Sequence, residues 1–286
     1  MSSSGYRHNL QDGHWVGIAR QWSQVGPPLR PSHEDLRFVE HAVDRLCESA
    51  GPPRVLILGV TPEFYRLPWP EATDVFAADH TQAMIDHIWP GPAGTAHLTE
   101  WTSLPFAAAS CDIVLCDGGL HLVKYPDDTS RLVHELRRML APGGLCILRL
   151  FIPPTKRETV QSVLADLQGG RIASLNHLKF RLWMALHDHP AEGVELGTVW
   201  NALHTGAPDL ESLAGRIGWS SEHILAINTY RNSESRYYFT GMDDVTRLFS
   251  EDPGGFEIES VHVPTYELGE QCPTVVLKRT ASEPPR

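Results

Sequence analysis

The sequence has no apolar run that approaches the roughly 20 residues of a membrane span. It carries a net charge of −11, and its 24 Lys and Arg residues form no dense cluster of the kind that follows a phosphate backbone. We therefore expect neither a membrane nor a nucleic acid as a partner. The first residues, MSSSGYR, lack a basic segment followed by an apolar core, so we expect no signal peptide and a cytoplasmic protein.

Cysteine is also scarce, because the chain has only five, an odd number. Three of them, Cys111, Cys116 and Cys146, lie in apolar strand-like runs. Reduced thiols in the core are therefore expected rather than a disulfide framework. With 286 residues, of which 42% are hydrophobic, the chain is long enough for a complete α/β core with an added segment, or for two small domains.

Residues 1–31 are polar and irregular apart from Trp15 and Trp22, and we interpret them as an arm or lid. Ser32 then begins a helix, because Ser32-His33-Glu34-Asp35 resembles a capping box. Apolar residues at spacings of three and four lie on one face of this helix, at Leu36, Val39, Val43 and Leu46.

From residue 54 the sequence alternates between strand-like and helix-like segments. Strands are predicted at 54–59, 74–79, 96–100, 111–117 and 145–151, with helices between them at 81–89 and 127–140. This alternation predicts an α/β, Rossmann-like fold with a mostly parallel sheet and helices on both faces. Residues 32–154 would form the ligand-binding core of this fold.

Residues 155–240 interrupt the alternation and are interpreted as a helical cap insertion. Helices are predicted at 156–168, 176–187, 196–204 and 208–217, and no clear strand is expected before about residue 222. Residues 241–286 would complete the core with a helix at 241–249 and strands at 256–263 and 274–278.

The strand-like run 55–58 ends at Gly59, and the next strand ends in a lone carboxylate, Asp79. In an alternating α/β sheet, such a pair places a close-fitting turn and an acid for ribose hydroxyls at the same edge. The turn has one glycine where a dinucleotide turn has three, so a nicotinamide dehydrogenase is a distant alternative.

The sequence resembles the class I S-adenosylmethionine (SAM) dependent methyltransferases, particularly those that act on small molecules. Five segments in this order carry the resemblance, namely VLILGVTPE, VFAADHTQAMI, TEWTSLPF, CDIVLCDGGLHL and ELRRMLAPGGLCILRLF. The resemblance covers residues 54–152 and returns at 241–279. It implies a seven-stranded sheet whose final strand is antiparallel, and it implies SAM as the cofactor.

The resemblance also implies roles for individual residues. Gly59 would let the main chain approach the methionine part of SAM, and Asp79 would accept hydrogen bonds from the ribose. Met84 would pack against the adenine, with Glu100 and Trp101 near its amine. Asp117 and Gly118 would form the floor under the sulfonium. The complete set of cofactor-binding residues expected from the resemblance is Gly59, Val60, Thr61, Glu63, Asp79, His80, Met84, Glu100, Trp101, Asp117 and Gly118.

The glycine turn departs from the usual family pattern, acidic-x-Gly-x-Gly-x-Gly. Ile57 stands at the acidic position, Thr61 and Glu63 replace two glycines, and Pro62 removes an amide donor. Two readings stay open at this point. The turn is either a divergent but competent SAM site, with Glu63 or Thr61 contacting the amino end, or a site that is altered or has lost SAM affinity.

Acceptor-side residues are expected in the loops that follow the strands. His121 and Tyr125 are the catalytic candidates, although a core or surface histidine is an equal alternative for His121. Arg149 and Phe151 would line the acceptor site, where an Arg could bind a carboxylate or instead make a structural salt bridge. Tyr237 would belong to a lid with Tyr230 and Tyr238, or pack in the core. His187-Asp188-His189 is a weak metal candidate, because its two histidines do not share a helix face.

The expected activity is SAM-dependent methyl transfer to an oxygen or nitrogen of a small organic acceptor, by a monomer or homodimer. Two alternatives stay open. Because the turn is altered, one alternative is a reaction at another carbon of SAM that releases methylthioadenosine, for example by cyclisation of the aminobutyrate arm. The chain could instead be a non-catalytic SAM-binding protein.

Overall fold

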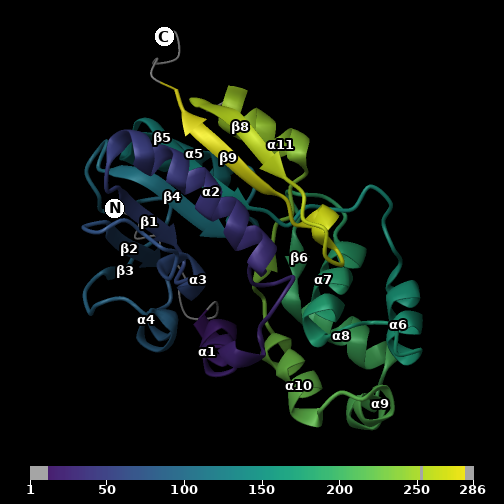
Figure 1. Cartoon of the computed structure of the whole chain (residues 1–286). Helices are drawn as coiled ribbons and strands as arrows, with labels where there is room; N and C mark the ends of the chain where they lie inside the picture. The colour runs from purple at the N-terminus through teal and green to yellow at the C-terminus, as the bar shows by residue number, and fades with distance from the viewer. Residues whose placement is uncertain (1–11, 252–253, 281–286) are drawn as a thin grey trace, which may run out of the picture.

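The structure is a computed structural model that describes residues 12–251 and 254–280 (Figure 1). Its main element is a seven-stranded sheet in the order β3-β2-β1-β4-β5-β9-β8. The strands are β1 (Arg54–Leu58), β2 (Asp74–Asp79), β3 (Ala96–Leu98), β4 (Cys111–Asp117), β5 (Leu140–Arg149), β8 (Phe256–His262) and β9 (Thr274–Arg279). β1 to β5 are parallel, and β9 runs antiparallel to both of its neighbours. The predicted fold class and the antiparallel final strand are confirmed.

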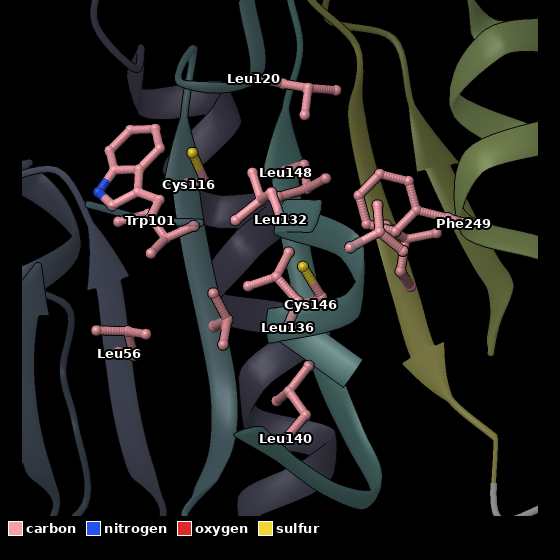
Figure 2. Packing of buried hydrophobic residues seen from close by; sticks show 14 of the residues in the cluster. Leu56, Trp101, Cys116, Leu120, Leu132, Leu136, Leu140, Cys146, Leu148 and Phe249 are labelled. Carbon is pink, nitrogen blue, oxygen red and sulfur yellow. The ribbon is translucent and has the colours of Figure 1, made fainter. Parts of the chain in front are cut away.

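Helices cover both faces of the sheet because the central strands are apolar on both sides. In β1, Leu56 and Leu58 belong to the cluster that includes α5 (Asp127–Met139), whereas Val55 and Ile57 belong to the cluster with α2 (His33–Ala50) and α4 (Gln82–Ile88). Successive side chains of a strand point to opposite faces, which produces this division. Figure 2 shows Leu132 and Leu136 of α5 directed at strand side chains of the first cluster.

α2 begins where the capping box predicts. The Ser32 hydroxyl accepts hydrogen bonds from the amides of Glu34 (3.2 Å) and Asp35 (3.3 Å). The Asp35 carboxylate in turn accepts the Ser32 amide at 2.8 Å. These bonds satisfy amides that have no partner within the helix, and they fix where the chain enters α2.

A helical unit follows β5 and has a hydrophobic cluster that lies mostly within it. It comprises α6 (Val160–Gln168), α7 (Leu175–Leu186), α8 (Leu196–Gly206), α9 (Leu210–Ile217), α10 (Ser221–Leu225) and the 3₁₀ helix η3 (Ala226–Tyr230). Figure 1 shows these helices together beside the sheet. The helices predicted in residues 155–240 are confirmed within a few residues at their ends.

The segments outside the core contain two elements that the sequence pattern did not predict. Residues 12–20 form a helix, α1 (Asp12–Arg20), which contacts both α4 and η3. A two-stranded sheet is also present in the insertion, because β6 (Val194–Glu195) pairs with β7 (Arg236–Tyr237). Strands of two residues are too short to carry a hydrophobic period, so the sequence pattern could not reveal them. The expectation for residues 1–11 lies outside the described residues.

The closing segment is shorter as an α-helix than predicted. α11 (Met242–Thr246) continues as a π-helical turn over Arg247–Glu251 before β8 begins. The short helix α3 (Pro62–Tyr65) lies directly after the glycine turn. Within the described residues, none of these helices combines the length and the apolar character that a membrane span requires.

The buried thiols lie in the core, as predicted for Cys111, Cys116 and Cys146. Burial raises the pKa of each of them, because the thiolate has no water around it there.

A matched pair of leucines tests this packing. Leu136 of α5 is fully buried, whereas Leu98 at the end of β3 is 56% exposed. Leu136→Ala should lower the free energy of unfolding by about 2–5 kcal/mol, because it leaves a cavity. Leu98→Ala should change it by less than about 0.5 kcal/mol. Urea denaturation of both variants measures the difference, and equal losses would contradict the packing described here.

Candidate functional site

One cavity lies at the carboxyl ends of the parallel strands. It encloses about 890 Å³ of space, part of which is open to solvent. The core contributes Gly59 after β1, Asp79 at the end of β2, Asp117 at the end of β4 and Phe151 after β5. This edge of an open α/β sheet is where such folds bind ligands.

The glycine turn brings main chain against the ligand space. Gly59 has φ +84°, a left-handed conformation that glycine adopts without steric cost. Its amide donates to the Ala78 carbonyl at 2.8 Å, which joins the turn to β2. Pro62 occupies the first turn of α3, where a missing amide donor is tolerated. Gly59, Val60 and Thr61 all line the cavity.

Glu63 does not line the cavity. Its carboxylate accepts a hydrogen bond from Arg30 Nε at 2.8 Å and forms an ion pair with the same guanidinium. Arg30 belongs to the segment before α2, and it also donates to the Val25 carbonyl at 3.0 Å. Glu63, which stands where the family pattern has a glycine, therefore connects the N-terminal segment to the glycine turn through Arg30.

Asp79 is 6% exposed and faces the same space as the glycine turn. Its Oδ1 accepts the Thr81 amide at 2.7 Å, and its Oδ2 lies 4.0 Å from the position that a Cβ on Gly59 would occupy. Burial raises the pKa of Asp79 to about 6, while the Thr81 amide and the adjacent His80 oppose that rise. A carboxylate held in this way fits the hydroxyls of a ribose.

Three side chains beside Asp79 form an apolar and aromatic wall. Met84 and Trp101 are buried, His80 is half-buried, and all three line the cavity. The Trp101 indole donates to the Ala78 carbonyl at 2.8 Å, which fixes the ring. Glu100, which the resemblance places near the adenine amine, is exposed and lies outside the wall. Its neighbour Trp101 lines the cavity.

A buried ion pair lies under the floor of the cavity. Asp117 and Arg149 are register partners on β4 and β5, and Arg149 Nε contacts Asp117 Oδ1 at 2.5 Å. Burial raises the pKa of Asp117, and the Arg149 guanidinium opposes that rise. Gly118 follows with φ +56°, and a Cβ there would lie 2.7 Å from the Phe151 ring. Asp117 and Gly118 both line the cavity.

Arg149 does not line the cavity. It is 1% exposed, and its Nη1 donates to the Pro28 carbonyl at 2.9 Å and to the Tyr266 hydroxyl at 3.3 Å. This position matches the structural alternative for Arg149, a salt bridge within the sheet.

His121 lines the cavity within a cluster of aromatic rings. It lies on the 3₁₀ helix η2 (Leu120–Leu122), and its ring stacks on Phe239 with centroids 5.2 Å apart. The rings of Phe151 (5.0 Å) and Tyr237 (4.6 Å) are also adjacent, and both residues line the cavity. Burial and the nearby Arg149 charge lower the pKa of His121 to about 3, so its imidazole is neutral near pH 7.

Tyr125 does not line the cavity. Its hydroxyl donates to Asp244 Oδ1 at 2.9 Å and accepts a hydrogen bond from Arg247. Of the two catalytic candidates, the structure brings only His121 into the cavity.

The remaining wall comes from segments far away in the sequence. The N-terminal arm contributes Trp15, Ile18, Trp22, Val25 and Leu29. The helical insertion contributes Lys179, Trp183, Tyr230 and Tyr237. The tryptophans at positions 15 and 22, in an otherwise polar segment, were the only sequence signal for the arm. Nothing in the sequence pattern distinguished Lys179 or Trp183 from other residues of a buried helix.

The His187-Asp188-His189 motif directly follows α7, and Asp188 accepts a hydrogen bond from Arg157 at 3.0 Å. Across residues 12–251 and 254–280, no group of three or more His, Cys, Asp or Glu side chains is placed to hold a metal ion.

Part of the chain matches a known protein family, and the whole chain is similar in fold to solved structures. Residues 59–148 match the family described as methyltransferase domain, and no curated protein matches the sequence. The CcbJ methyltransferase from Streptomyces caelestis is a similar solved structure, at 14% identity and a TM-score of 0.52, over 94% of this chain and 98% of that chain.

Two further solved structures are similar in fold. A protein from Rhodobacter sphaeroides, described as a Zn-dependent alcohol dehydrogenase, is 16% identical with a TM-score of 0.57, over 93% of this chain and 97% of that one. The PH0226 protein from Pyrococcus horikoshii OT3 is 15% identical with a TM-score of 0.51, over 91% of this chain and 98% of that chain. At such identities these likenesses establish the shared fold.

The role of Asp79 is testable by substitution. Asp79→Ala should weaken SAM binding by about 1–3 kcal/mol, because it removes hydrogen bonds to a charged acceptor. The control is Asp86→Ala, which removes an exposed acid from the neighbouring helix α4. Titration calorimetry with SAM measures both variants. An unchanged affinity in Asp79→Ala would remove Asp79 from the site.

The raised pKa of Asp79 predicts a pH dependence. Binding to ribose hydroxyls requires the ionised carboxylate, whereas the protonated form becomes the major one below the pKa of about 6. SAM affinity should therefore fall between pH 7.5 and pH 5, by up to about tenfold. Asp79→Asn should bind weakly and lack this pH dependence. A wild-type affinity that is constant over this range would contradict the assignment.

Proposed function

We propose that this chain is a class I SAM-dependent methyltransferase that methylates an oxygen or nitrogen of a small organic molecule, since residues 59–148 match the methyltransferase domain family. One observation carries the proposal. The cavity has a polar side formed by the ends of β1 and β2, and a second side formed by aromatic residues of the arm and the insertion. The first side suits SAM, and the second suits a small, mainly apolar acceptor.

The residues on the first side fit the chemical parts of SAM. Asp79 supplies a buried carboxylate for the ribose hydroxyls, and Met84 and Trp101 supply flat and flexible apolar surface for the adenine. The left-handed Gly59 allows the main chain to approach the methionine arm. When bound, SAM supplies a methyl group on a sulfonium, which is electrophilic without further activation.

The chain then has to orient the acceptor and exclude water, and alignment of the two reactants supplies much of the acceleration. Trp15 and Trp22 of the arm and Trp183 and Tyr237 of the insertion all line the cavity. The Arg30–Glu63 pair and the bond from Arg149 to Pro28 hold the arm in this position. A cavity closed by these segments favours a small molecule over an extended peptide.

We assign His121 to hydrogen bonding with the acceptor. Its Nδ1 is buried and has no hydrogen-bond partner among the described residues. A group with a pKa of about 3 is a poor general base near pH 7, but a neutral imidazole accepts a hydrogen bond from a hydroxyl or an amine. His121 would therefore orient the nucleophile, and would not carry its proton away before methyl transfer.

Product analysis tests the reaction. We expect the protein, incubated with SAM and a panel of small phenols and aromatic amines, to produce S-adenosylhomocysteine together with a methylated acceptor. Formation of methylthioadenosine without S-adenosylhomocysteine would contradict methyl transfer and favour attack at another carbon. Failure of both SAM and S-adenosylhomocysteine to bind below about 1 mM would contradict the enzyme assignment.

Substitution of His121 tests its proposed role. His121→Ala should lower kcat for an acceptor found in the panel by about tenfold or more, since the acceptor loses an orienting hydrogen bond. His134→Ala, which removes an exposed histidine from α5, is the control. Because His121 stays neutral, the ratio of the His121→Gln rate to the wild-type rate should be constant from pH 5 to pH 9. If the wild-type rate falls at low or high pH and the His121→Gln rate does not, the neutral-histidine assignment is overturned.

A further inference from the structure

Lys179 is a buried cation in the wall of the cavity. It lies on α7, and it is 6% exposed. Ser174 is the N-cap of this helix, and its hydroxyl accepts a hydrogen bond from the His177 amide. Lys179 and Trp183 are one helical turn apart, and both line the cavity. Burial lowers the pKa of Lys179 to about 8, because the ammonium has lost water.

None of the described acids compensates this charge. Among the described residues, Lys179 has no hydrogen-bond or ion-pair partner, and its ammonium lies 5.1 Å from the centre of the Tyr230 ring. Arg181, two residues later on α7, contacts Glu158 (2.9 Å) and Asp166 (2.6 Å). Within the described part of the chain, Arg181 of α7 is therefore paired with acids, whereas Lys179 of the same helix is not.

The described residues of the arm and the insertion that line the cavity include no acid. The acids in the cavity wall are Asp79 and Asp117, and Asp117 is already paired with Arg149. His223 of α10 is close enough to interact with Lys179, and burial together with the Lys179 charge lowers the pKa of His223. A buried charge without a partner is costly, so a site of this kind is stabilised by an anion that arrives with a ligand.

We propose that Lys179 binds a carboxylate of the acceptor, so that the acceptor is a small aromatic or apolar acid. This inference rests on the proposed function and specifies its substrate class. The neighbours of Lys179 on α7 support the aromatic part, since the Trp183 ring lies 5.2 Å from Tyr237 and 6.1 Å from His121. The carboxylate would meet the ammonium while the apolar body packs on these rings.

SAM itself carries a carboxylate on its methionine arm, so the same chemistry has a second source. Asn176, one turn before Lys179, donates to the Gln24 carbonyl at 3.1 Å, which places the start of α7 against the arm. The aromatic surroundings of Trp183 favour the acceptor as the source. The experiment must therefore measure SAM and the acid separately.

Matched acid and amide pairs provide the test. The probes are benzoate with benzamide, 4-hydroxybenzoate with 4-hydroxybenzamide, and indole-3-acetate with indole-3-acetamide, each titrated into protein saturated with S-adenosylhomocysteine. The variants are Lys179→Met, which keeps an aliphatic chain of similar size, and Lys179→Arg, which keeps the charge. Lys156→Met removes an exposed lysine and matches the change in net charge.

For at least one pair, wild type and Lys156→Met should bind the acid about tenfold more tightly than the amide. Lys179→Met should lose this preference, Lys179→Arg should keep part of it, and SAM affinity should stay within about twofold in all variants. Thermal melting should show that Lys179→Met is no less stable than wild type, because it removes an uncompensated buried charge.

Three outcomes would overturn the inference. The first is that no acid binds wild type more tightly than its amide, and the second is that the preference survives in Lys179→Met. The third is a loss of SAM affinity in Lys179→Met with the acid preference unchanged, which would assign Lys179 to the methionine carboxylate. Failure of wild type to bind SAM at all would instead contradict the proposed function.

Discussion

The ion pair between Arg149 and Asp117 joins the ends of β4 and β5 beneath the cavity, and the arrangement around it depends on this pair. The two residues are register partners on adjacent parallel strands, so their side chains leave the sheet on the same face. Arg149 also donates to the carbonyl of Pro28 and to the hydroxyl of Tyr266. One guanidinium thus connects two core strands, the N-terminal arm and the loop before β9. Removing either partner would leave a buried charge, which is far more costly than the pair itself is stabilising.

This connection explains how three separate segments enclose one cavity. The strand ends provide the glycine turn and the acids, but an open sheet edge alone would leave a ligand exposed to water. Arg149 and the Arg30–Glu63 pair hold the arm across the edge, and α1 contacts the insertion through η3. The aromatic residues that the arm and the insertion contribute then exclude water from the place where two reactants have to be aligned.

The charges of the cavity fall into two kinds. Asp117 and Arg149 compensate each other, and Glu63 is compensated by Arg30, so these groups serve the architecture. Asp79 and Lys179 have no oppositely charged Lys, Arg, Asp or Glu partner among the described residues, and both face the cavity. Burial opposes the charged form of each, raising the pKa of Asp79 and lowering that of Lys179. Groups of this second kind are the ones that a ligand is expected to satisfy.

The sequence by itself determined the sheet, the glycine turn and the position of Asp79, because hydrophobic period, turn residues and strand ends are local properties. It placed Gly59, Asp79, Met84, Trp101 and Asp117 on elements that do converge on one cavity. Only the tertiary structure decided the direction and the partners of the remaining side chains. Glu63, Tyr125 and Arg149 lie close to the predicted positions along the chain, yet each is engaged by a residue at least 32 positions away and lies outside the cavity wall. The arm and Lys179 also reach the cavity through tertiary packing. The packing of the whole chain decides which helix face or turn lies against a distant strand end.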